Sequence, residues 1–296
     1  ERLRGRFDAS MQRHRLRREI LAMRIANEVV NRMGPAYALR AAEDTATSIT
    51  KVVRAYVIAR EVFEVRPIWS AIEAADNVVP PALQYELLFQ LGRMLRRAAY
   101  WLLQRHPHNL VIDELVSTMQ PQAAAVTTRL LELQTPSGRE RVQRDIEELA
   151  EMGVSPALAH NLAALGRMTQ TLDIIEVAAK HSLEVPSTAR LYFQLAQGLE
   201  LDWMREEIED LTVDSRWQAV ARDTLRQNLA RQHSAVLGRI LSSRAKKSPQ
   251  EALVDWFEQR GEAISRVRQI VQDMRAQEGA DFATLSVAIR EIERLA

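Results

Sequence analysis

Cysteine is absent from this chain of 296 residues. Its absence excludes disulfide scaffolds, thiolate metal sites and cysteine nucleophiles. A chain without cysteine is compatible with a reducing compartment, and we expect a cytoplasmic protein.

Glycine and proline are also scarce, with ten residues of each. Both residues interrupt helices, so their scarcity favours long helical segments. Apolar residues recur at helical spacing through most of the chain, and no stretch shows sustained alternation of apolar and polar residues. The sequence therefore predicts an all-α fold, a multi-helix bundle.

Long uncharged apolar runs and an excess of one charge are absent as well, and aromatic residues are few. No run reaches the ~20 apolar residues that a membrane span needs, and the first ten residues lack the features of a signal peptide. The formal net charge is +1 and aromatic residues make up 5%. We therefore expect no membrane partner and no nucleic-acid partner.

Capping signals divide the helical pattern into segments. Gly34 and Pro35 are expected to end a first helix that carries Leu16, Ile20, Met23, Ala26, Val30 and Met33. Ser248 and Glu251 fit a capping box, and Asp214 is expected to cap another helix. Residues 214–244 and 248–277 would then form a long C-terminal helical hairpin.

The chain is expected to form a single helical domain over residues 1–296. Residues Thr135 to Gly138 offer the best break, with possible lobes at 1–134 and 139–296. The chain begins without methionine and inside a helical pattern, so we expect it to be a piece of a longer protein.

A search for chemical motifs assigns no catalytic, cofactor-binding or metal-binding residue. The closest glycines are Gly153 and Gly166, which rules out the clustered glycines of a dinucleotide or Walker A loop. His106 and His108 are the only close histidines, and their i,i+2 spacing does not place two ligands on one helix face. No nucleophile elbow occurs.

Asn27 and Asn31 lie one helical turn apart within an apolar pattern that ends at Gly34. A ligand site would need converging polar partners, and the sequence identifies none. We interpret Asn27, Asn31 and Gly34 as structural residues, a polar joint at which the amides satisfy nearby backbone groups.

Several long segments resemble the C-terminal helical region of the large bacterial NAD-specific glutamate dehydrogenases. The resemblance covers nearly the whole chain, and its main segments are IANEVVNRMGPAYALR (25–40), VVRAYVIAREVFEVRPIWSAIEAADNVVPPALQYELL (52–88), Arg96-Arg97 to Leu103, DIIEVAAKHSLEVPSTARLYFQLAQGLELDW (173–203), LDWMREEI (201–208), RWQAVARDTLRQNL (216–229) and LSVAIREIERLA (285–296).

This resemblance implies a parent enzyme that deaminates L-glutamate oxidatively to 2-oxoglutarate with NAD. The catalytic Rossmann domain would lie upstream and be the domain's partner in the same chain. The parent would be a homo-oligomer, whereas this fragment would bind no cofactor and be inactive alone.

Two alternatives remain at this stage. The chain could be a free-standing helical scaffold or adaptor. It could also bind nucleic acid through arginines, which cluster in residues 1–18 and at Arg93, Arg96 and Arg97.

Overall fold

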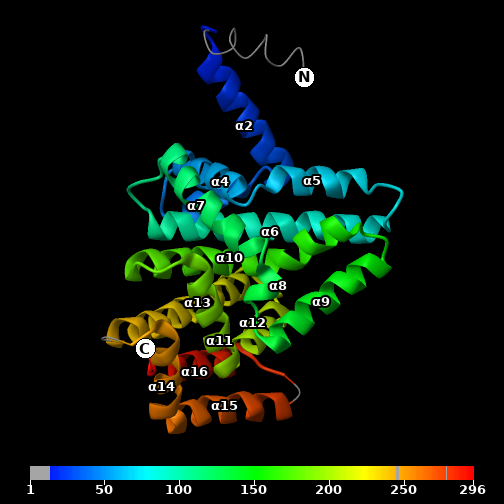
Figure 1. Cartoon of the computed structure of the whole chain (residues 1–296). Helices are drawn as coiled ribbons and strands as arrows, with labels where there is room; N and C mark the ends of the chain where they lie inside the picture. Colours follow the sequence, from blue (N-terminus) through cyan, green and yellow to red (C-terminus); the bar gives the residue numbers. More distant parts are fainter. Residues whose placement is uncertain (1–13, 245–246, 278) are drawn as a thin grey trace. The chain divides into compact units, whose positions relative to one another are not determined.

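A computed structural model describes residues 14–244, 247–277 and 279–296 (Figure 1). Every regular element in these ranges is a helix. The prediction of an all-α fold is therefore confirmed. None of the helices within these ranges is both long and apolar enough to cross a membrane.

The chain divides into two compact units, residues 1–120 and 121–296. The division falls within helix α7 (Ile112–Thr127), at Pro121, a residue that has no backbone N–H to donate within a helix. This division differs from the break expected at residues 134–139, where Thr135 caps a helix of the second unit. The Thr135 hydroxyl accepts a hydrogen bond from the Gly138 N–H, and Pro136 occupies the first turn.

The first unit is built around two helices, α4 (Ile49–Val62) and α6 (Pro81–Arg105). Helices α2 (Arg17–Met33), α3 (Tyr37–Asp44) and α5 (Val65–Ala74) adjoin this pair. The first part of α7 belongs to the same unit. Both helices bury small and large side chains, since Ala55 of α4 and Ala98, Leu91 and Leu95 of α6 are all fully buried.

The second unit has helix α10 (Pro156–His181) at its centre, packed against its neighbours on several sides. Buried residues occur on all faces of α10, as expected for a core helix. The other helices of the unit are α8 (Leu130–Leu133), α9 (Pro136–Glu151), α11 (Val185–Gly198), α12 (Leu201–Asp210), α13 (Arg216–Ser243), α14 (Pro249–Gln259), α15 (Gly261–Ala276) and α16 (Phe282–Glu293).

The predicted C-terminal hairpin is only partly correct. Its first arm is the single helix α13, and Ser248 forms the expected capping box with Glu251 at the start of the second. However, the second arm breaks at Arg260, after which α15 turns away from α14 (Figure 1). Gly261, a poor helix former, lies at this break.

Two smaller expectations concern the ends of helices. The side-chain cap of α13 comes from Ser215, whose hydroxyl accepts from the Gln218 N–H, and not from Asp214. Helix α2 ends at Met33 as predicted, and Gly34 follows with a φ of 89°, in the left-handed region that favours glycine.

Candidate functional site

A polar cavity of about 460 Å³ lies between α9, α11, α12 and α15 in the second unit. Arginines Arg141, Arg144 and Arg275 and carboxylates Glu140, Glu200, Asp202 and Glu206 supply its charged lining. We call this feature the polar cavity. Its residues come from three separate stretches of the chain, which the packing of helices within the unit brings together.

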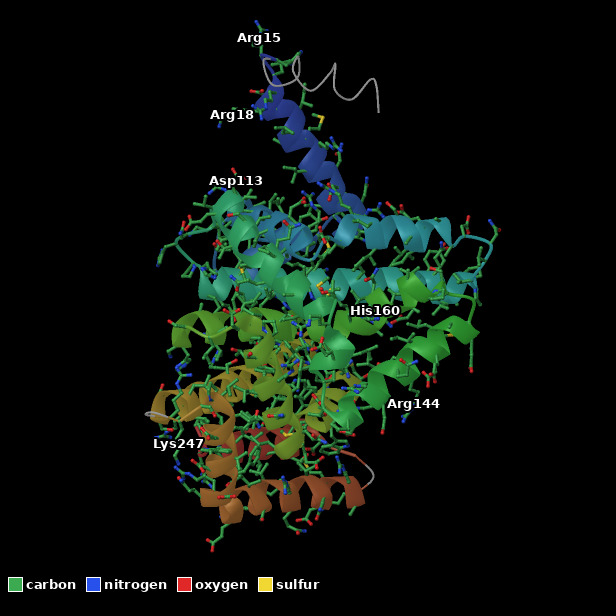
Figure 2. The ribbon with its side chains drawn as sticks, viewed as in Figure 1. Arg15, Arg18, Asp113, Arg144, His160 and Lys247 are labelled. Carbon is green, nitrogen blue, oxygen red and sulfur yellow. The ribbon has the colours of Figure 1, made fainter. Side chains whose placement is uncertain are left out.

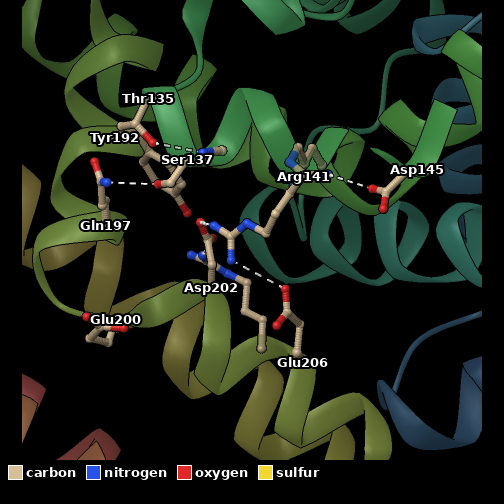
Figure 3. Close-up of polar contacts among 12 residues, drawn as sticks. Thr135, Ser137, Arg141, Asp145, Tyr192, Gln197, Glu200, Asp202 and Glu206 are labelled. Carbon is tan, nitrogen blue, oxygen red and sulfur yellow. Dashed lines mark hydrogen bonds and ion pairs between the residues drawn. The ribbon is translucent and has the colours of Figure 1, made fainter. Parts of the chain in front are cut away.

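Local structure explains how α9 and α12 present these groups. The Thr135 cap and Pro136 fix the start of α9, so Ser137, Arg141 and Arg144 follow at i, i+4 and i+7 on one face. Ser137 accepts a hydrogen bond from the Gln197 amide at 2.8 Å, which ties α9 to the end of α11 (Figure 3).

Glu200 connects α11 and α12 and has a left-handed backbone, with a φ of 57°. This conformation is uncommon for a residue other than glycine. The Glu200 carboxylate accepts from Arg275 at 2.8 Å, and the Arg275 guanidinium lies 5.0 Å from the centre of the Trp203 ring. The ion pair and the cation–π contact connect the end of α15 to this turn.

Arg141 joins α9 to α12 through two carboxylates. Its guanidinium lies 2.7 Å from Asp202 and 3.5 Å from Glu206 (Figure 3). Asp202 also accepts from Arg205 at 2.7 Å. Asp202 therefore lies between two arginines, one from α9 and one from α12.

The contacts continue from Asp202 into the core of the unit. Arg205 lies 2.7 Å from Nδ1 of His233, and Nε2 of His233 lies 3.0 Å from the Tyr192 carbonyl oxygen. Because arginine can only donate, Nδ1 accepts, and the Nε2–H donates to the carbonyl. His233 is fully buried and is held in this neutral form.

The electrostatic surroundings of His233 agree with that assignment. Burial lowers its pKa well below the usual 6.5, and the positive charge of Arg205 lowers it further. The hydrogen bond to the Tyr192 carbonyl acts in the opposite direction. A proton on Nδ1 would face the Arg205 guanidinium, so the imidazole cannot gain charge without breaking this contact.

Carboxylates near the cavity respond differently. Burial raises the pKa of Glu206 and of Asp145, while Arg141 and Arg167, respectively, oppose these shifts. Burial also lowers the pKa of Arg167. These ion pairs hold helices together. Arg144 also lines the cavity, and its guanidinium forms no ion pair among the described residues.

The residues predicted from sequence to be structural do not belong to this cavity. Asn27 and Asn31 lie on α2 in the first unit, and both are exposed. Neither amide makes a hydrogen bond within the described part of the chain. Their role as a polar joint stays a prediction, and it would require a partner beyond these residues.

Other features tested from sequence have ordinary surroundings. Within the described residues, no group of three or more histidine, aspartate or glutamate side chains could hold a metal ion. The basic cluster of residues 1–18 lies largely outside the described ranges. In the second basic cluster, Arg93 pairs with Glu86 at 2.6 Å.

Sequence reasoning missed the polar cavity. One signal was available, since Asp202, Trp203 and Glu206 lie in the segment LDWMREEI that carries the family resemblance. However, their partners lie about 60 residues upstream or more than 60 downstream, and no local pattern identifies them.

Comparison with known proteins identifies relatives over the whole chain. The family model described as "Glutamate dehydrogenase, C-terminal" matches residues 1–294. NAD-specific glutamate dehydrogenases from Pseudomonas aeruginosa and Halomonas elongata are 34% and 31% identical over 98% of this chain. The protein of the same name from Mycobacterium tuberculosis is 30% identical over 99%.

The matched region covers 18% of the length of each of these relatives. The similarity therefore concerns one part of a much longer protein. The extent of the family match shows that the chain belongs to the family of glutamate dehydrogenase C-terminal regions.

Proposed function

We propose that the chain is the non-catalytic C-terminal helical domain of a large NAD-dependent glutamate dehydrogenase. The observation that carries this proposal is the match of residues 1–294 to a family defined by that C-terminal region, within relatives of which it covers 18%. The parent enzyme would convert L-glutamate, NAD and water into 2-oxoglutarate, ammonium and NADH.

The chemistry of the polar cavity supports a structural role for this domain. Arg141 and Arg275 are paired with carboxylates, and His233 is buried with both ring nitrogens engaged. A general base must reach its substrate within hydrogen-bonding distance. The His233 imidazole cannot do so while it bonds to Arg205 and to the Tyr192 carbonyl.

The parent enzyme supplies the remaining elements of the proposal. Its upstream catalytic domain would bind NAD and would be the main partner of this domain in the same chain. A homo-oligomer in the cytoplasm, acting in amino-acid catabolism, is the assembly we propose. The helical domain would support the catalytic domain and contribute to assembly or regulation.

A comparison of three preparations tests the proposal. The first preparation is the full-length enzyme, the second is a shortened enzyme that ends before residue 14 of this chain and so lacks the helical domain, and the third is the 296-residue chain alone. Each is assayed for glutamate-dependent NADH formation, and its NAD binding is measured by calorimetry. We expect turnover from the full-length enzyme and neither turnover nor NAD binding from the chain alone. NAD binding by the chain would contradict the non-catalytic assignment, and full turnover by the truncated enzyme would contradict the supporting role.

A further inference from the structure

Helix α2 has two apolar faces, and only one of them packs against the described residues of the first unit. Val29 is 3% exposed, and Glu28 on the same side accepts from the buried Arg60 of α4 at 2.6 Å. These contacts lie near the C-terminal end of α2, whose other end projects from the unit in Figure 1. Arg15 and Arg18 mark that projecting end in Figure 2.

The opposite face of α2 carries a stripe of exposed apolar side chains. Leu16, Ile20, Met23 and Val30 are 46%, 38%, 68% and 46% exposed. Together with Asn27 they follow one another at intervals of four, three, four and three residues, which places all five on one side of a helix. We call these five residues the α2 stripe.

A stripe of this kind is typical of a helix that docks into a groove. Monomeric proteins expose single apolar residues commonly, but contiguous exposed stripes mark interaction sites. Peptide helices that bind grooves present anchors three, four and seven residues apart, and the members of the α2 stripe recur at these separations. Asn27, flanked by Met23 and Val30, adds one polar group that would fix the register of docking.

Two occupants compete for the α2 stripe. The four-three spacing, with asparagine at one core position, would also suit a coiled coil with a second copy of this chain. That pairing is weak, because the stripe spans about two heptads and sustained coiled coils need roughly three or four. The rest of a longer chain has the advantage of covalent linkage, which supplies an effective concentration of roughly millimolar.

We propose that the α2 stripe docks into an apolar groove on the portion of the parent enzyme that precedes this domain, with a polar group of that groove paired to the Asn27 amide. This inference rests on the proposed function, since it takes the preceding portion to be present. It identifies the face of the helical domain that meets the rest of the enzyme.

Hydrogen–deuterium exchange tests the docking. Peptides covering residues 16–31 are followed in the full-length enzyme and in the 296-residue chain at two concentrations. We expect exchange at least about tenfold slower in the full-length enzyme, and rapid exchange at both concentrations in the chain alone. Equal rates in the two proteins would overturn the proposal, and protection of the chain that rises with concentration would assign the stripe to a second copy instead.

Two adjacent substitutions supply the specificity control. Met23→Asp places a carboxylate in the α2 stripe. Ala22→Asp places it at an exposed position outside the stripe, because Ala22 lies seven residues before Val29 and therefore on the same side of the helix as Val29. We expect only Met23→Asp to remove the protection in the full-length enzyme. Because Met23 is exposed in this chain, the same variant should leave the melting temperature of the chain unchanged, which separates loss of docking from misfolding.

Measurement of turnover separates this inference from the proposed function. A full-length enzyme that protects α2 but shows no glutamate turnover would contradict the function and leave the docking intact. An active enzyme whose α2 exchanges as rapidly as in the chain alone would contradict the docking and leave the function intact.

Discussion

Acidification should destabilise the second unit through His233. The imidazole is fully buried and neutral, and its pKa is lowered well below the unfolded value of 6.5, mainly by burial. A group with a depressed pKa contributes stability above its unfolded pKa, and this stability is lost as the pH falls. Below pH 6.5 the unfolded chain binds a proton that the folded chain does not, so the free energy of unfolding decreases.

The size of the effect follows from linkage. Each pH unit between the unfolded and folded pKa values changes stability by about 1.4 kcal/mol. From pH 7.5 to pH 5.5, His233 should therefore cost the second unit about 1.4 kcal/mol. Asp145 and Glu206 have raised pKa values, so their protonation acts in the opposite direction and stabilises the folded unit as the pH falls through their folded pKa values.

Native-state hydrogen exchange of α13 amides over pH 5.5–7.5, corrected for the intrinsic rate, measures this slope in the second unit itself. His233→Gln keeps polar atoms at the position, and we expect the variant to be less stable at pH 7.5. Because glutamine cannot titrate, the change in the free energy of unfolding between pH 7.5 and pH 5.5 should be smaller by about 1.4 kcal/mol. His160→Gln, in α10 of the same unit, is the matched control and should retain the slope. An unchanged slope in His233→Gln would refute the reasoning.

Three further predictions concern the packing, a helix cap and the polar joint. A β-carbon at Gly198 would lie 2.3 Å from the Phe257 ring, so Gly198→Ala should lower the free energy of unfolding by about 1–3 kcal/mol. Gly166 has open space around it, so Gly166→Ala should raise the free energy of unfolding by about 0.5–1 kcal/mol. Urea unfolding compares the two variants, and equal effects would contradict the clash. Thr135→Ala removes the side-chain cap of α9 and should cost about 1 kcal/mol by the same assay, while Thr135→Ser should restore most of it. Asn27→Leu should change the thermal stability or domain docking of the parent enzyme and not its chemistry; unchanged stability with lost glutamate turnover would contradict this.

Local signals predicted the helices well where a cap or a breaker marks the boundary. Gly34 ends α2, and Ser248 opens α14 with its capping box. The break at Arg260 had no comparable signal, because Gly261 alone costs a helix only about 1 kcal/mol. Tertiary packing of α15 against α16 can exceed that preference, and the sequence pattern does not show where such packing begins.

The candidate site was much harder to predict than the helices. Arg141 and Asp202 are 61 residues apart, and Glu200 and Arg275 are 75 residues apart. Each side chain alone is typical of a solvated helix face, and only the folded unit places them within ion-pair distance. The asparagines on α2 show the reverse case, since a pattern that suggested a buried joint lies exposed in this chain.

The preference for arginine over lysine explains how these distant segments are joined. Four of the 40 basic residues are lysines, and two arginines that join separate helices each contact two carboxylates. Arg60 pairs with Glu28 and Glu61 in the first unit, and Arg141 pairs with Asp202 and Glu206 in the second. A planar guanidinium can bond to two acceptors at once, whereas an ammonium group acts as a point charge. The ion pairs of Arg60 and Arg141 therefore help to fix the relative positions of helices within each unit, and our proposal assigns the exposed α2 stripe to contact with another part of the parent enzyme.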